Sequence, residues 1–121
     1  MPNESFLVNR LKAIRYAVRG AILLIRTEAS IKVQVFIGLI MTALGFYFDI
    51  TSVEWILQIF AISLVLSIEG LNTAVEKMAD FVHPDFNEKI GFIKDISAGA
   101  VMIVSSASVI IGFIIYLPKL F

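Results

Sequence analysis

Four polar residues recur at helical spacing in an otherwise apolar part of the chain. They are Glu69, Asn72, Glu76 and Asp80, separated by three, four and four positions. At about 100° per residue, this spacing places them on one stripe of a helix, with Thr73 at its edge. Carboxylates inside a membrane are costly unless they are paired, bind a metal or face water, so a row of them indicates a functional site. Polar packing between helices and a proton path are the alternatives.

Three further charged residues are expected at the same depth in the membrane. Glu28 precedes the first long apolar segment, and Lys94 and Asp95 stand together where the last one begins. Phosphoryl transfer needs carboxylates to hold a divalent cation, a cation to neutralise the moving phosphoryl group, and a base to orient the attacking hydroxyl. The combined set of residues offers each of these parts.

The common nucleotide-binding motifs are missing from the sequence. It contains no G-x-x-x-x-G-K-[ST] segment, no glycine-rich kinase loop and no Asp-Phe-Gly. A P-loop NTPase and a protein-kinase fold are therefore excluded. There is also no cysteine, which removes disulfides and thiolate chemistry. Any nucleotide site must be of another kind.

The composition indicates an integral membrane protein. Hydrophobic residues make up 59% of the 121 positions and charged residues 17%, and the mean hydropathy is +0.91, far above that of an ordinary soluble domain. Uncharged segments at 33–48, 55–68 and 96–117 mark three crossings, which we place at about 30–49, 53–76 and 94–117. We predict an all-α fold in a single domain over residues 1–121.

A basic amphipathic helix is predicted before the first crossing, over about residues 5–28. Its apolar residues alternate with Arg10, Lys12, Arg15, Arg19 and Arg26. The helix either only sets the orientation of the protein or also forms a wall of the site, and both interpretations stay open.

The charges of the flanks predict the topology. Six of the ten basic residues lie in the first 32 positions, so the N-terminus is expected in the cytoplasm by the positive-inside rule. The turn at 49–54 has no Lys or Arg and is expected outside, the loop near Lys77, Lys89 and Lys94 inside, and the C-terminus outside. The stripe on the second crossing then opens to the cytoplasm.

Small residues predict close helix packing. Gly38 and Gly45 stand one heptad apart on the first crossing, which lets another helix approach. A neighbouring protomer is a candidate for that helix.

Two segments resemble a known family. Glu69 to Glu76 (EGLNTAVE), Asp80, and Lys94 to Val101 (KDISAGAV) are similar to the signature of the prokaryotic diacylglycerol kinases, which include undecaprenol kinases. Residues 15–32 also resemble the family's surface helix. The resemblance implies a homotrimeric helical bundle in the bacterial inner membrane, with active sites between subunits. It further implies transfer of the ATP γ-phosphate, with Mg²⁺, to a lipid hydroxyl, giving phosphatidic acid from diacylglycerol or undecaprenyl phosphate from undecaprenol.

The resemblance also implies roles for individual residues. Glu69 is expected to be the general base, and Glu28 and Glu76 the metal ligands. Nucleotide contacts are expected from Tyr16, Asn72, Glu76, Asp85, Phe86, Asn87, Lys94 and Asp95. Lipid contacts are expected from Arg10, Glu69 and Ala98. Asp80 resembles a position near the site, but a salt bridge to a basic residue such as Lys77 or Lys89 is an equally good interpretation.

The alternative function is a small proton-conducting or ion-conducting membrane subunit. A conducting path should place polar groups through the whole membrane depth, whereas the charges of this chain gather at one end of the crossings. That distribution favours chemistry at the membrane surface. The acceptor lipid stays open, because diacylglycerol and a polyprenol both present a primary hydroxyl. We expect no nucleic-acid partner.

Overall fold

The computed structural model describes residues 5–121, and this part of the chain forms four helices. They are α1 (Phe6–Thr27), α2 (Ala29–Tyr47), α3 (Ser52–Val82) and α4 (Glu88–Leu120). The fold is all-α, and α2, α3 and α4 are long and apolar enough to cross a membrane. Both α3 and α4 are longer than the predicted crossings, so each carries polar residues past the apolar region.

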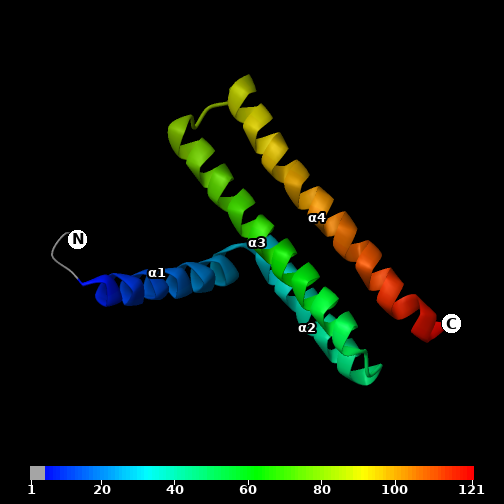
Figure 1. The fold of residues 1–121 in the computed structure, drawn as a ribbon. Coiled ribbons are helices and arrows are strands. Elements are labelled where there is room, and N and C mark those ends of the chain that lie inside the picture. The colour runs from blue at the N-terminus through cyan, green and yellow to red at the C-terminus, as the bar shows by residue number, and fades with distance from the viewer. Residues whose placement is uncertain (1–4) are drawn as a thin grey trace.

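The two longest helices form a hairpin. In Figure 1, α3 and α4 lie side by side, α2 packs along the half of α3 that is nearer to the turn at 48–51, and α1 projects sideways from the start of α2. Because α2 has 19 residues against 31 in α3 and 33 in α4, the hairpin extends past α2. The extended end carries the loop 83–87 and is called the loop end below.

Polar residues fix where each helix begins. The Ser5 hydroxyl accepts a hydrogen bond from the Val8 amide at the start of α1. Thr51 and Glu54 form a reciprocal capping box at the start of α3, and the Asn87 side chain accepts from two amides at the start of α4. Such side chains satisfy amides that lack a partner in the first turn. Between α1 and α2 the backbone is extended at Glu28 alone, so this carboxylate sits at a corner.

The main apolar core lies at the end opposite to the loop end. Ile50, Ile115 and Tyr116 are buried there, and Met41, Leu44, Phe48, Trp55 and Ile111 pack against them. Asp49 has a φ of 51°, in the left-handed region that reverses the chain tightly. The turn therefore holds α2 and α3 together beside the end of α4.

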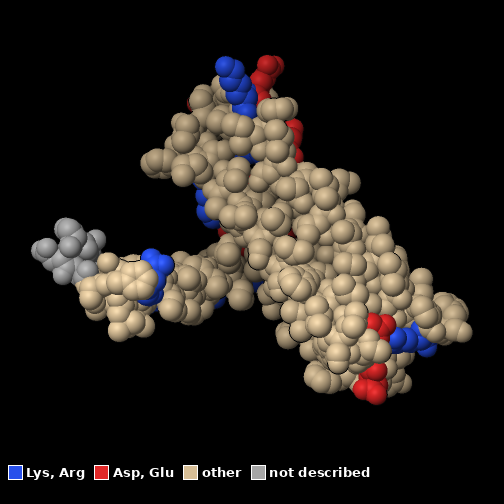
Figure 2. Space-filling model, viewed as in Figure 1, with Lys and Arg blue, Asp and Glu red and all other residues tan. Residues whose placement is uncertain are grey.

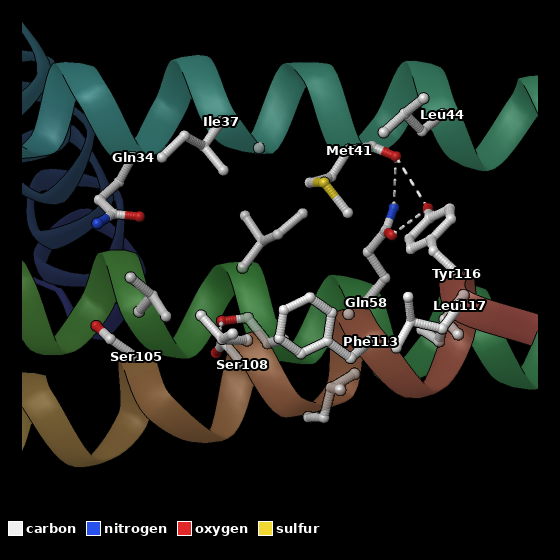
Figure 3. A pocket seen from close by; sticks show the side chains of 18 of the residues that line it. Gln34, Ile37, Met41, Leu44, Gln58, Ser105, Ser108, Phe113, Tyr116 and Leu117 are labelled. Carbon is white, nitrogen blue, oxygen red and sulfur yellow. Dashed lines mark hydrogen bonds between the residues drawn. The ribbon is translucent and has the colours of Figure 1, made fainter. Parts of the chain in front are cut away.

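A polar network ties the three spans together inside this core (Figure 3). Gln58 is only 4% exposed, and its Nε2 donates to the Met41 carbonyl at 3.0 Å. The Tyr116 hydroxyl donates to Gln58 Oε1 at 2.6 Å and lies 3.2 Å from the same carbonyl. The network joins α2, α3 and α4.

The two glycines of the first crossing pack within the chain. A Cβ at Gly38 would lie 3.2 Å from Ile62 Cγ2, and a Cβ at Gly45 would lie 2.6 Å from Trp55 Cη2. Both glycines are buried. The helix that they admit is α3 of the same chain, and the prediction of a neighbouring protomer at this face is wrong. The flat glycine surface is used to seat the large Ile62 and Trp55 side chains.

Most of the charged side chains lie near the two ends of the bundle, along α1 and at the corner between α1 and α2. Figure 2 shows Lys, Arg, Asp and Glu at the loop end, at the opposite end, along α1 and where α1 joins the bundle. At the opposite end Lys119 Nζ lies 3.0 Å from Glu54 Oε2 and pairs α4 with α3. None of the α1 residues is buried, as a helix lying at a membrane surface requires.

Candidate active site

The predicted stripe of polar residues is a continuous face of α3. Glu69, Asn72, Glu76 and Asp80 lie on the helix Ser52–Val82 without a break. Glu69 is 8% exposed, whereas the Asp80 side chain is 62% exposed. The stripe thus runs from a buried carboxylate in the bundle to exposed groups at the loop end. Among the described residues, the Glu69 side chain has no hydrogen bond or ion pair.

Asn72 donates a hydrogen bond to Glu76, and its own acceptor oxygen has no partner among the described residues. Its Nδ2 donates to Glu76 Oε1 at 3.2 Å. Its Oδ1 is buried and has no hydrogen-bond partner within residues 5–121. A buried polar atom left in this state costs about 1–3 kcal/mol. The amide oxygen is therefore available to accept from a donor or to bind a cation.

Glu28 is brought to α3 by an ion pair and by packing. Lys77 Nζ lies 3.3 Å from Glu28 Oε1, and Lys77 follows Glu76 directly in the sequence. The end of α1 also meets α3, since a Cβ at Gly70 would lie 3.0 Å from Leu24 Cδ1. The corner between α1 and α2 is thus held against the part of α3 that carries the carboxylates.

Lys94 of α4 pairs with Asp80 of α3. Lys94 Nζ lies 2.5 Å from Asp80 Oδ1. The predicted ion pair of Asp80 is therefore confirmed, but its suggested partners, Lys77 and Lys89, are wrong. The hairpin sets Lys94 directly across from Asp80, while Lys77 turns toward Glu28.

A shallow hollow opens beside this pair at the loop end. It has a volume of about 90 Å³ and is lined by Asp80, residues 83–87, Ile90, Gly91 and Lys94. The predicted nucleotide-binding residues Asp85, Phe86 and Asn87 therefore lie around one space together with Lys94. The His83 ring holds the shape of the loop, because its Nδ1 lies 2.7 Å from the Asp85 carbonyl oxygen.

Other predicted site residues stay apart from this cluster. Arg10 and Tyr16 are exposed on α1, which projects away from the hairpin (Figure 1), and the Arg10 guanidinium lies 5.6 Å from the centre of the Phe6 ring. Asp95 and Ala98 are exposed on α4. Within residues 5–121, no three Asp, Glu or His side chains gather closely enough to hold a metal ion by themselves. The described part of the chain therefore brings together only some of the predicted site residues.

The oxygen atoms on α3 and at the Glu28 corner nevertheless fit Mg²⁺. This ion prefers oxygen ligands, and it is usually bound by one or two carboxylates, several waters and substrate phosphates rather than by a complete protein cage. Glu76 supplies a carboxylate on α3, and Glu28, which pairs with the neighbouring Lys77, supplies another from the corner. The unpartnered Oδ1 of Asn72 supplies a third oxygen beside Glu76.

An apolar groove begins one helical turn from Glu69. It has a volume of about 690 Å³ and lies between α2, α3 and α4, as Figure 3 shows. On α3 its lining includes Gln58, Ala61, Val65 and Leu66. Gln58, Ala61, Val65 and Glu69 recur at spacings of three and four, so the groove and the buried carboxylate share one face of α3.

Sequence reasoning missed Gln58 and Tyr116. Both are buried, and together they bind three helices. The signal for Gln58 was its place as a lone amide in the uncharged segment 55–68, because a polar group at membrane depth needs a partner. No comparable signal marks Tyr116, because its partners depend on how α4 packs against α2 and α3.

The fold and these groups define an all-α, multi-pass membrane protein whose carboxylates and lysine suit phosphoryl transfer. Residues 15–116 match the family model described as prokaryotic diacylglycerol kinase. The chain belongs to this family of ATP-using lipid kinases.

Named relatives cover most of the chain. It is 32% identical over 109 residues to the undecaprenol kinase of Bacillus subtilis, which covers 90% of this chain and 89% of that protein. It is 29% identical over 97 residues to the diacylglycerol kinase of Haemophilus influenzae, with 80% and 82% covered. It is also 29% identical over 113 residues to the diacylglycerol kinase of Synechocystis, with 93% and 65% covered. Both lipid substrates thus occur among the names of its relatives.

Proposed function

We propose that this protein transfers the γ-phosphoryl group of ATP to the hydroxyl of diacylglycerol or undecaprenol at the cytoplasmic surface of the bacterial inner membrane. The observation that carries the proposal is the position of Glu69. This buried carboxylate lies where the apolar groove ends and the polar stripe toward the loop end begins. A lipid hydroxyl at that point has an apolar path for its chain on one side and charged groups on the other.

Glu69 acts as the general base. Its carboxylate accepts the proton of the lipid hydroxyl as the hydroxyl oxygen bonds to the γ-phosphorus, and the bond from that phosphorus to the bridging oxygen of ADP breaks. General base catalysis of this kind contributes about 10²–10⁴-fold to a rate. The low exposure of Glu69 also keeps water, a competing acceptor, away from the reacting oxygen.

Glu28, Glu76 and the Asn72 Oδ1 would hold Mg²⁺, with the nucleotide phosphates supplying further oxygen ligands. When bound, the ion neutralises charge on the phosphates and aligns them for transfer. The Asn72 amide nitrogen keeps Glu76 oriented by its hydrogen bond. The extended corner at Glu28 places a carboxylate from a second segment beside α3.

The loop end binds the nucleotide. Lys94 faces the phosphates, and Asp85, Phe86 and Asn87 border the rest of the molecule around the hollow. Phe86 is 87% exposed, so its ring is available to pack on a nucleobase. Asp95, exposed next to Lys94, contacts the nucleotide from the outer side.

Neighbouring protomers complete the site in a homotrimer. Three features of the chain support this part of the proposal: α1 projects away from its own hairpin, the buried Asn72 Oδ1 has no partner within residues 5–121, and no metal cage of three acidic or histidine side chains forms there. Arg10, Tyr16 and Ala98, which are exposed in one chain, then contact lipid or nucleotide across a subunit boundary.

The test is transfer of labelled phosphate from γ-labelled ATP to lipid. Purified protein in detergent micelles with Mg²⁺ is offered diacylglycerol and undecaprenol in separate reactions. We expect label in at least one lipid, and the faster acceptor identifies the substrate. Glu69→Gln should abolish transfer while a fluorescent ATP analogue still binds.

A matched control changes a carboxylate to an amide at the other end of the bundle. Asp49→Asn is suited to this, because Asn tolerates the left-handed backbone at that position. It should leave transfer unchanged. Absence of label in both lipids, with wild-type protein that elutes as a single species, would refute the kinase proposal.

A further inference from the structure

The Lys94–Asp80 pair lies at the hollow of the loop end. Both residues line that hollow, and they come from the two helices that the loop joins. Asp80 follows Glu76 by one turn on α3 and continues the stripe that begins at Glu69. It is the last charged residue of α3 before the loop.

From this geometry we infer that Asp80 is a positioning residue for the nucleotide: its carboxylate holds the Lys94 ammonium at the hollow so that the phosphates meet an oriented cation. The inference rests on the proposed kinase function and adds a residue to it. Asp80 acts through Lys94 and does not itself touch the reacting atoms.

Stability alone does not account for this pair. The side chains of Lys94 and Asp80 are 36% and 62% exposed. Ion pairs with this much exposure are screened by solvent and contribute little to folding. The hairpin also has a second ion pair, Lys119–Glu54, at its other end, where the two side chains are 24% and 21% exposed. The pair at the loop end therefore contributes less to the stability of the hairpin than Lys119–Glu54.

Positioning follows from the chemistry of lysine. A lysine side chain has a flexible stem of four carbons, and fixing it on a ligand costs conformational entropy. Asp80 reduces this entropy cost of nucleotide binding, because Lys94 Nζ already lies 2.5 Å from Asp80 Oδ1 in the free protein. The ammonium has three N–H donors. One is used by Asp80, which leaves two for phosphate oxygens.

The opposite role predicts the opposite result. A carboxylate beside a phosphate-binding lysine also repels phosphate, and a shielding Asp80 would have to be displaced when ATP binds. Removal of a shield lowers the KM for ATP, whereas removal of a positioning group raises it. The direction of the change therefore separates the two roles.

The experiment compares Asp80→Ala and Asp80→Asn with wild-type protein in the lipid phosphorylation assay. Asp80→Ala should raise the KM for ATP by up to about tenfold, the change expected when a flexible side chain must be ordered during binding. The KM for the lipid should not change. Asp80→Asn keeps an acceptor oxygen and should rescue part of the loss.

Lys119→Met is the matched control. It breaks the ion pair between α3 and α4 at the opposite end and leaves the Thr51–Glu54 capping box intact. It should not alter the KM for ATP. A rise equal to that of Asp80→Ala would show a general effect of loosening the hairpin and would overturn the inference.

A double-mutant cycle tests the route through Lys94. Binding of a fluorescent ATP analogue with Mg²⁺ is measured for Asp80→Ala, Lys94→Met and the double variant. If Asp80 acts by holding Lys94, Asp80→Ala has no further effect once Lys94 is gone. The inference is overturned if Asp80→Ala leaves the KM for ATP unchanged or lowers it. It is also overturned if Asp80→Ala weakens binding of the analogue equally in the presence and in the absence of Lys94. In both cases lipid phosphorylation by the wild type still upholds the kinase proposal. Absence of wild-type transfer rejects the kinase proposal itself.

Discussion

The Tyr116 hydroxyl donates a hydrogen bond to Gln58 Oε1 at 2.6 Å, and this bond joins α4 to α3 inside an apolar bundle. Gln58 uses its amide nitrogen on the Met41 carbonyl of α2. A single glutamine therefore connects all three spans. The network lies at the far end of the groove from Glu69. A change in the network should therefore alter stability and leave phosphoryl transfer unchanged.

Removal of this hydroxyl should destabilise the protein without changing its chemistry. Tyr116→Phe leaves Gln58 Oε1 buried and without its donor, which we expect to lower the free energy of unfolding by about 1 kcal/mol, within the range measured for hydrogen bonds between membrane helices. Unfolding in mixed micelles as the fraction of denaturing detergent rises measures the change. The double variant Gln58→Leu, Tyr116→Phe should recover part of the loss. Equal stability of Tyr116→Phe and wild type would contradict the assigned hydrogen bond.

Gly45 should not tolerate even a methyl group. A Cβ there would lie 2.6 Å from Trp55 Cη2 and 2.9 Å from Cζ2, so Gly45→Ala forces the indole to move. Overpacking of this kind costs about 1–3 kcal/mol. The same unfolding measurement applies, with Gly112→Ala as the control, because nothing lies within 4 Å of a Cβ at Gly112. The packing described for α2 on α3 fails if the two variants are equally stable.

Gly70 should control the position of Glu28. Leu24 at the end of α1 packs on Gly70, and a larger side chain pushes that end of α1 and the corner after it away from α3. We expect Gly70→Leu to lower kcat by up to about 100-fold, the effect of a misplacement of about 1 Å at an active site. Leu24→Ala in the same chain should restore part of the rate. A loss that Leu24→Ala does not relieve would point to Gly70 itself.

The proposed metal ligands, Glu28 and Glu76, should affect the Mg²⁺ dependence of the activity. Glu28→Gln and Glu76→Gln should each raise the Mg²⁺ concentration for half-maximal activity by at least about tenfold, since even residues that only support a ligand have effects of this size. Glu88→Gln is the control, because Glu88 is an exposed carboxylate in the first turn of α4 near the same end. Titration of Mg²⁺ at saturating ATP makes the comparison. Identical curves for all three variants would remove Glu28 and Glu76 from the metal site.

The local pattern of the sequence was sufficient to predict the class of protein. Uncharged segments marked the three apolar helices, and the spacing of Glu69, Asn72, Glu76 and Asp80 put them on one face of α3, as found. Both inferences depend on helical geometry within one segment, which the chain itself fixes. The segments EGLNTAVE and KDISAGAV were sufficient for the family, which the match over residues 15–116 confirms.

Contacts between helices were decided only by the tertiary structure. The sequence offered Lys77 and Lys89 to Asp80, but the rotation and offset of α4 against α3 place Lys94 there and leave Lys77 to Glu28. The same geometry joins Tyr116 to Gln58. Such pairings depend on how one rigid helix lies against another, and neighbours along the chain carry no record of that relation. Helical periodicity therefore determined which residues share a face, and helix packing determined what each face meets.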